Sequence, residues 1–274
     1  LKQIVLVALS FLKNIFKMVS LLVLVLFSFF YTDRVMNFIN KKDPLMNKID
    51  LLKDKYEILP VNAVLDSNTI IPGVKGKSVD LDKSYENMKV SGIFREDYLV
   101  YNDILPSEML SNNMDKYIIG GNTSSNRVSL LVITNYDNID KIKNNNITIF
   151  LNHKDVSINN IKKINKNSIY TYGNNGIYSE EILDNDNTII NRISKNKSIY
   201  CLSMGKNNDT LSICNKKKMY VVIPSIVGDY LDIKNNLTNG SIILLNDMNN
   251  LDIIVKYINS KGYMIVPLEE LLTE

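Results

Sequence analysis

Short runs of apolar and β-branched residues recur along the second half of the chain, separated by polar stretches with helical periodicity. The runs lie at 128–134, 147–151, 168–172, 198–203, 219–224, 241–245 and 263–267. Continuous apolar strands that alternate with amphipathic helices are typical of parallel strands covered by helices. The pattern predicts an α/β fold over residues 126–274, a distorted (β/α) barrel with about seven parallel strands. An open doubly wound sheet is the alternative.

The patterning between residues 33 and 125 is mixed. Residues 33–54 are charged and predict a helical stalk. Residues 55–125 predict a small α+β region, with strands at Tyr56–Leu65, Thr69–Ile71 and Tyr98–Tyr101. A short helix is expected at Asp80–Val90, because Asp80 can cap its start and a glycine follows its end.

The first 32 residues carry the longest apolar run of the chain. Met18–Thr32 is uncharged and would span about 22 Å as a helix, less than a bilayer core of about 30 Å. Lys17 can reach the interface, which lengthens the usable segment. We expect an N-terminal membrane anchor that leaves the rest of a single-pass protein outside the cytoplasm. A cleaved signal peptide and a buried core helix are the alternatives, and the run lacks a small-residue cleavage site.

Composition excludes several classes of site. The net charge of +3 is too small and too evenly spread to indicate a nucleic-acid partner. The one histidine, His153, rules out metal sites built from several histidines. Cys201 and Cys214 fit neither zinc-finger nor thioredoxin spacing, and we expect each in the core as a small apolar residue. The spacing leaves open whether they are bonded to each other.

Three segments carry a resemblance to a known family. They are NNNITIFLNH (144–153), IYTYGNNGIYS (169–179) and GSIILLNDMNNLDIIVKYINSKGYMIVPLEELL (240–272). Through them residues 127–274 resemble the NodB-like polysaccharide deacetylases, the carbohydrate esterases of family four. The resemblance implies a distorted barrel of seven parallel strands and a divalent metal held by one Asp and two His. It also implies a second Asp as base and a further His as acid.

The chain departs from that pattern at the residues that carry the chemistry. Asn175 and Ser179 stand at the places of the two metal-binding histidines, and Asn246 stands at the place of the acid histidine. Asp137 is the carboxylate nearest the missing acidic pair, and Asp247 is kept. Because an amide oxygen is a weak neutral ligand, we expect low zinc affinity and no metal cofactor.

Polar and aromatic residues follow several predicted strands, at the barrel edge where ligands bind. The candidate catalytic residues are Asp137 and Asp247, and the candidate ligand-pocket residues are Asn135, Tyr172, Asn174, Asn175 and Asn246. The alternative is that the Asn and Asp side chains stabilise loops, with Asp247 capping a helix at 248–258. Tyr172 and Tyr178 are expected either to stack on sugar rings or to cover the barrel mouth.

Three functions are consistent with these features. The first is a membrane-anchored, extracytoplasmic, deacetylase-like protein that lacks metal-dependent activity and binds cell-wall glycan or an envelope protein. The second is an active carbohydrate N-deacetylase on cell-wall glycan, with a non-standard site around Asp137 and Asp247. The third is a structural tether in which residues 55–125 bind the partner. Resemblance of fold alone does not decide among them.

Overall fold

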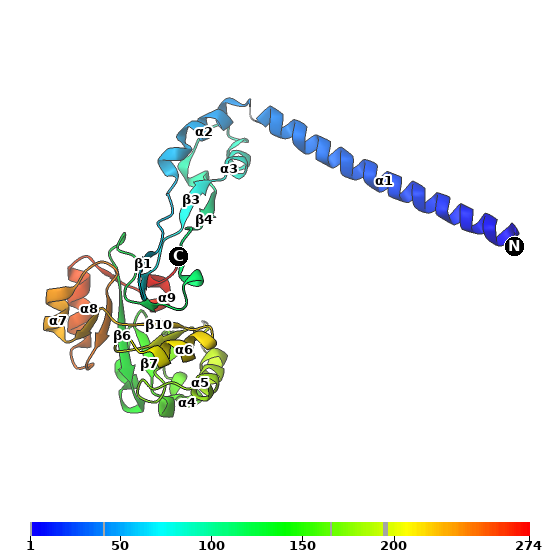
Figure 1. The fold of residues 1–274 in the computed structure, drawn as a ribbon. Helices are drawn as coiled ribbons and strands as arrows, with labels where there is room; N and C mark the ends of the chain where they lie inside the picture. The colour runs from blue at the N-terminus through cyan, green and yellow to red at the C-terminus, as the bar shows by residue number, and fades with distance from the viewer. Residues whose placement is uncertain (1, 41, 165, 194–196) are drawn as a thin grey trace. The chain divides into compact units, whose positions relative to one another are not determined.

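The computed structural model describes residues 2–40, 42–164, 166–193 and 197–274 (Figure 1). The chain divides into two compact units. One comprises residues 1–58 and 77–103, and the other comprises residues 59–76 and 104–274. The sequence predicted a boundary at residue 125 between a small α+β region and the barrel. The structure divides the chain differently, because short strands before residue 125 pair with strands of the second unit.

The first unit begins with helix α1 (Lys2–Asn40). Within it Ile15–Thr32 has a mean hydropathy of 2.1 and none of it is buried, so this stretch is long and apolar enough to cross a membrane. Helix α2 (Pro44–Tyr56) starts at Asp43, whose side chain accepts a hydrogen bond from the backbone N–H of Leu45 at 2.7 Å. Within the predicted helical stalk, residues 33–40 and 44–54 are helical, and Lys42 and Asp43 lie between the two helices.

A small core joins α2 to helix α3 (Leu81–Met88) through the fully buried Ile49 and Met88. Asp80 caps α3 by accepting from the backbone N–H of Lys83, as predicted. Strands β3 (Gly76–Val79) and β4 (Tyr101–Ile104) form a two-stranded sheet. The strand expected at Tyr98–Tyr101 was misplaced, because Glu96–Tyr98 forms a short 3₁₀ helix, η1, and β4 begins only at Tyr101.

The second unit contains two sheets. The first has the order β11 (Ile226–Gly228), β12 (Ile242–Leu245), β6 (Arg127–Thr134), β7 (Thr148–Leu151) and β8 (Ile169–Thr171), with β13 (Met264–Ile265) also beside β6. The second has the order β1 (Val64–Asp66), β2 (Thr69–Ile71), β5 (Tyr117–Ile118), β10 (Tyr220–Val222) and β9 (Tyr200–Leu202). All pairs are parallel except β1 with β2. The predicted α/β fold with parallel strands is confirmed.

The run at 219–224 connects the two sheets. The backbone N–H of Ile223 still donates to Ile118 in the second sheet, whereas that of Ser225 donates to Ile242 in the first. Pro224, which has no N–H to donate, lies between them. The chain thus changes sheets within three residues, and β11, which was not predicted, follows at once.

Residues 59–76 and 104–125 belong to the barrel-like unit and not to a separate region. Strand β5 is only two residues long, yet Tyr117 and Ile118 are fully buried and pair with both β2 and β10. Of the strand expected at Tyr56–Leu65, only its last two residues enter β1. Local patterning could not find these pairings, because β5 meets β10 across about a hundred residues of sequence.

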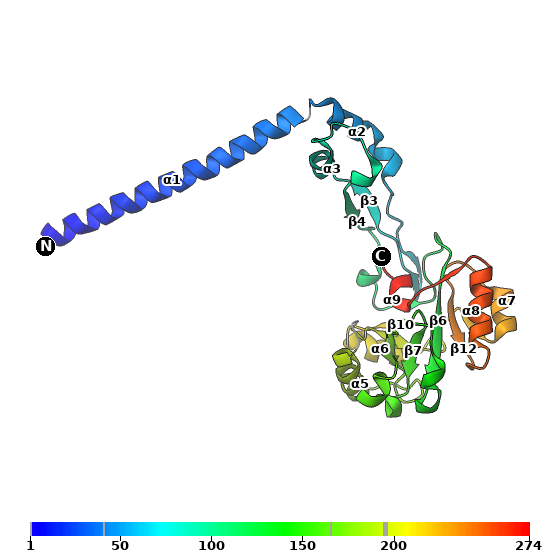
Figure 2. The same ribbon diagram turned by 180° about the vertical axis from the view of Figure 1, so that it is seen from behind.

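Side chains on each strand alternate between two cores, which explains why the strands are apolar throughout. On β6, Leu130 belongs to one cluster and Leu131 to the other, and on β7 Ile149 and Phe150 divide in the same way. The first cluster includes residues of the outer helices and the second fills the interior. Both views place α7 (Tyr230–Asn236) beside α8 (Leu251–Ser260), away from α4 (Ile158–Ile161), α5 (Glu180–Ile193) and α6 (Asn208–Lys216) (Figures 1 and 2).

Strands β8 and β9 belong to different sheets, and we call the line between them the seam. A row of four interior aromatic rings crosses it, with centroids separated by 5.5, 5.3 and 6.0 Å. This aromatic row consists of Phe150, Tyr170, Tyr200 and Tyr220. Tyr170 and Tyr200 meet edge to face at the seam. Side-chain packing therefore joins the two sheets at the seam, where no ladder of hydrogen bonds connects the described strands β8 and β9.

Helix α9 (Leu268–Leu271) covers the amino-terminal ends of these strands. Glu269 accepts hydrogen bonds from the hydroxyls of Ser168 and Tyr170. Leu268 and Leu271 pack into the interior cluster. Side chains of α9 fill this end of the interior, which leaves the carboxyl ends of the strands as the place where a ligand could bind.

Candidate functional site

The candidate residues lie at the carboxyl ends of strands in the first sheet. Asn246 and Asp247 follow β12, Asn135 and Asp137 follow β6, and Tyr172, Asn174 and Asn175 follow β8. Strands β12, β6, β7 and β8 are consecutive neighbours in that sheet. The residues therefore share one edge, as the pattern predicted, although they are not brought to a single point.

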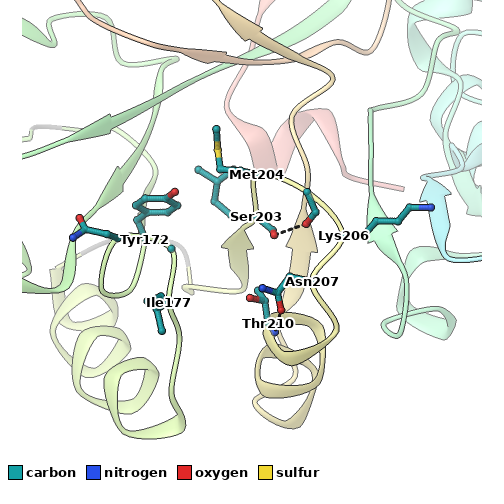
Figure 3. A pocket seen from close by; sticks show the side chains of 11 residues that line it. Tyr172, Ile177, Ser203, Met204, Lys206, Asn207 and Thr210 are labelled. Carbon is teal, nitrogen blue, oxygen red and sulfur yellow. Dashed lines mark hydrogen bonds between the residues drawn. The ribbon is translucent and has the colours of Figure 1, made fainter.

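A pocket of about 340 Å³ opens at this edge, between the β8–α5 loop and the β9–α6 loop (Figure 3). It is lined by Tyr172, Asn175, Gly176, Ile177, Leu202, Ser203, Met204, Gly205, Lys206, Asn207 and Thr210. Two candidates, Tyr172 and Asn175, are among these. The other pocket-forming residues were not predicted, and the β9–α6 loop carries no sequence signal beyond its glycine and polar residues.

The β8–α5 loop turns tightly through left-handed backbone. Gly173, Asn175 and Gly176 have φ angles of 61°, 53° and 85°. Asn174 and Ile177 exchange backbone hydrogen bonds of 2.9 and 3.1 Å across the turn. Asparagine is among the few non-glycine residues that tolerate this conformation, which gives Asn175 a structural role in addition to its place in the pocket.

A disulfide bond joins Cys201 on β9 to Cys214 on α6, and both residues are fully buried. The prediction that each lies in the core is correct, and the question of bonding is answered. The bond closes a loop whose two ends are 13 positions apart. Seven of the eleven pocket-lining residues, Leu202–Asn207 and Thr210, lie within that loop.

Tyr178 links the two pocket loops. Its hydroxyl lies 3.0 Å from both the backbone nitrogen and the carbonyl oxygen of Leu202, and 3.4 Å from the carbonyl oxygen of Thr171. Burial raises the pKa of Tyr178 well above its usual range, so the hydroxyl stays protonated. The expectation that Tyr178 could stack on a sugar is wrong, because only 5% of its surface is exposed.

The remaining candidates are occupied locally or exposed. The Asp247 carboxylate accepts from the backbone N–H of Asn249 at 2.8 Å. It does not cap α8, which begins at Leu251. Asn135 accepts from the side chain of Asn138 at 3.2 Å. Asp137 is exposed on the 3₁₀ helix η3 (Tyr136–Lys141), and neither it nor Asp247 lines the pocket. The structure does not bring Asp137 and Asp247 together in this pocket, and their catalytic role stays a prediction.

The lining of the pocket is nearly free of charge. Its titratable side chains are Tyr172, whose pKa burial raises, and Lys206. The Lys206 side chain points away from Tyr172 and the other labelled residues (Figure 3). Among the described residues no group of three or more His, Cys, Asp or Glu side chains could hold a metal ion. The arrangement offers hydrogen bonds and an aromatic ring, which suits an uncharged polar ligand.

Comparisons with known proteins agree with the resemblance at the level of the fold. No protein-family model matches the chain. The uncharacterised protein YlxY of Bacillus subtilis is 37% identical over 92 residues, which is 33% of this chain and 29% of YlxY. The match thus spans less than a third of that relative's length.

Two solved structures of one protein match most of the chain. Wild-type BA3943 of Bacillus anthracis, described as a family-four carbohydrate esterase pseudoenzyme, has a TM-score of 0.63 at 19% identity. The match covers 85% of this chain and 96% of BA3943. A BA3943 mutant with restored enzymatic activity matches with the same TM-score and identity, over 99% of its length. The chain therefore has the fold of these deacetylase-like proteins.

Asn175 and Ser179, which the sequence resemblance puts at the places of the two metal-binding histidines, do not suit the zinc that this resemblance implies. Asn175 lies exposed in its left-handed turn, and the Ser179 hydroxyl accepts from the backbone N–H of Ile182 at the start of α5. Both side chains are neutral oxygen or amide donors, whereas zinc prefers histidine, thiolate and carboxylate ligands.

Proposed function

We propose that this chain is a membrane-anchored, extracytoplasmic pseudoenzyme that binds cell-wall glycan in the pocket between the β8–α5 and β9–α6 loops. The observation that carries the proposal is the half-buried ring of Tyr172 in a pocket whose lining combines neutral polar and apolar side chains with a single charged residue, Lys206. Ligand pockets combine an aromatic or apolar surface with a few convergent hydrogen-bonding groups. A sugar ring offers an apolar face and several hydroxyls, which matches this lining.

The proposed lack of metal-dependent deacetylation rests on the residues that stand where the resembling family has its metal ligands. Asn175 and Ser179 serve the turn and the start of α5, and neither is a strong zinc ligand. The similarity to BA3943, itself described as a pseudoenzyme, supports the same conclusion.

Two observations support the location. The apolar stretch Ile15–Thr32 in α1 is long and apolar enough to cross a membrane, and none of it is buried against the rest of the described chain. The Cys201–Cys214 disulfide supports a compartment outside the reducing cytoplasm. Both agree with an anchor that places the second unit on the outer side of the membrane.

The glycan proposal is tested by calorimetry on the full chain in detergent micelles, with chito-oligosaccharides and peptidoglycan fragments as probes. Binding is expected to weaken about tenfold or more in Tyr172→Ala, which is ~1.4 kcal/mol. Tyr172→Phe keeps the ring and serves as the matched control. Absence of glycan binding by the wild-type protein would refute the binding role.

The pseudoenzyme part is tested separately. The purified chain is dialysed against zinc, its metal content is measured, and release of acetate from chito-oligosaccharides is followed. We expect no stoichiometric zinc and no acetate above the uncatalysed rate. One tightly bound zinc together with deacetylation would overturn this part of the proposal, whatever the binding experiment shows.

The location is tested in cells. The full chain is expected in the membrane fraction, and a protease added from outside should cleave the second unit. Removal of residues 1–40 should move the protein to the soluble fraction. A second unit that remains protected from external protease in cells with the outer layers removed would contradict the proposed orientation.

A further inference from the structure

Both backbone polar groups of Gly173, the second residue of the β8–α5 loop, are held by hydrogen bonds to residues that do not line the pocket. Its N–H donates to the hydroxyl oxygen of Thr171 at 2.9 Å. Its carbonyl oxygen accepts from the backbone N–H of His153, which follows β7, at 2.7 Å. Gly173 is itself in left-handed backbone, and a Cβ there would lie 2.5 Å from the carbonyl oxygen of Ile177. The loop is closed so tightly at this point that a shift of Gly173 must move its neighbours.

One buried carboxylate contacts the side chains of both residues that hold Gly173. Asp186, on α5, is 1% exposed. One of its oxygens accepts from the hydroxyl of Thr171, and the other lies 2.7 Å from Nδ1 of His153, the only histidine of the chain. An unpaired buried carboxylate is very costly, so these two partners are required by its burial.

The direction of these hydrogen bonds is fixed by the chemistry. A carboxylate can only accept, so the Thr171 hydroxyl donates to Asp186 and its oxygen remains free to accept from Gly173. Toward an acceptor of this kind, His153 donates through the tautomer that carries its hydrogen on Nδ1. Hydrogen bonds in such a chain polarise and strengthen one another, and those that end on a charged group are the strong ones.

We propose that Asp186 is the positioning residue of the pocket: through Thr171 and His153 it fixes the backbone of Gly173, and with it the wall that carries Tyr172 and Asn175. The ligand-binding part of this inference rests on the proposed function. Asp186 does not line the pocket, and it acts only through the residues that it holds. A wall fixed in advance lowers the ordering cost that a ligand must otherwise overcome.

Thr171 provides the sharpest pair of variants. Thr171→Val has nearly the same shape and lacks the hydroxyl, so it leaves both the Gly173 N–H and one Asp186 oxygen unpaired. Thr171→Ser retains the hydroxyl and should restore the network. On α5, Asp186→Asn removes the buried charge, and Asp184→Asn is its control, because Asp184 is a carboxylate on the exposed face of the same helix.

The first measurement needs no ligand. Amide hydrogen exchange at Gly173 in the full chain is expected to be about tenfold faster or more in Thr171→Val and Asp186→Asn. It should be unchanged in Thr171→Ser and Asp184→Asn. Exchange is referred to the slowest amides of β6, so that a global loss of stability is separated from a local one. If Asp186→Asn does not fold, the Thr171 pair decides alone.

The second measurement is calorimetric affinity for chito-oligosaccharides, expected to fall about tenfold in the same two variants and to be retained in the two controls. Unchanged exchange at Gly173 in Thr171→Val would overturn the inference, and so would unchanged affinity of that variant for a glycan that the wild type binds. If the wild type binds no glycan, the proposed function fails, while the exchange measurement still decides whether Asp186 positions the loop.

Discussion

The hydroxyl of Tyr178 donates a hydrogen bond to the carbonyl oxygen of Leu202 and accepts another from the backbone N–H of the same residue, each at 3.0 Å. A neighbouring strand would normally make these two bonds. Tyr178 therefore takes the place of a strand at the end of β9, where the seam separates it from β8. The side chain belongs to the loop after β8, so it ties the two sheets together beside the pocket.

Substitution of Tyr178 by Phe should show what this bridge contributes. The buried backbone groups of Leu202 would lose their partner, and an unsatisfied buried polar group costs about 1–3 kcal/mol. We expect the free energy of unfolding, measured by urea titration, to fall by that amount. Tyr230→Phe is the control, because the Tyr230 hydroxyl has no hydrogen bond among the described residues and its ring contact with Tyr257 is retained. Equal stability of the two variants would contradict the bridging role.

The disulfide should stabilise the β9–α6 wall of the pocket. A bond that closes a loop of roughly 15 residues contributes about 3 kcal/mol by restricting the unfolded chain. The double variant Cys201→Ala, Cys214→Ala is expected to lose about that much stability. Thiol titration of the unfolded wild-type protein without reductant should find no free thiol. Two free thiols in protein recovered from the membrane would show that the bond does not form in the cell.

The left-handed backbone at Asn175 predicts that Asn175→Ala lowers the stability of the protein, whereas Asn175→Gly leaves it nearly unchanged. Asn175→Ala keeps the Cβ but loses the short polar side chain that makes left-handed backbone tolerable for asparagine, and for ordinary residues this conformation costs about 1–2 kcal/mol. Asn175→Gly removes that cost and should keep the stability within about 0.5 kcal/mol of the wild type. Thermal unfolding of the three proteins at one pH measures both. A variant with Ala as stable as that with Gly would mean that the turn differs from the one described.

The cap of α3 should make the first unit sensitive to acid. Lys83, through its side chain and its backbone N–H, lowers the pKa of the partly buried Asp80 carboxyl below its usual value. Because the folded pKa is the lower one, this stabilisation is complete above about pH 4 and is lost as the pH falls through the folded value. The melting temperatures of wild type and Asp80→Asn should therefore converge between about pH 6 and about pH 2. A difference that grows toward low pH would contradict the sign.

The strands that could be predicted are those whose signal is local. The run 128–134 is apolar throughout because it contributes to both cores, and this property is visible in the sequence itself. Strand β11 and helix α7 were missed, since Pro224 ends the preceding run and conceals that the chain continues into the other sheet. The role of β5 was also missed, because a two-residue strand has no periodicity of its own.

The site was less predictable than the fold. The carboxyl-end position of Tyr172 and Asn175 follows from the strand pattern, and both line the pocket. The contacts that hold the pocket do not follow from it. Asp186 and His153 are 33 positions apart, and an aspartate within an amphipathic helix normally indicates an exposed face. Only the three-dimensional packing shows that this carboxylate is buried.

The aromatic row makes the seam observable by fluorescence. The chain contains 15 tyrosines and no tryptophan, so it has no indole emission of its own. The row ends at Tyr220, whose ring is 6.0 Å from that of Tyr200. An indole introduced by Tyr220→Trp would collect excitation energy from the tyrosines across the seam while the two sheets stay together. Tyr200 lies on the same side of the seam as Tyr220, so its transfer would persist, whereas the share that comes from Tyr170, across the seam, would fall when β8 separates from β9.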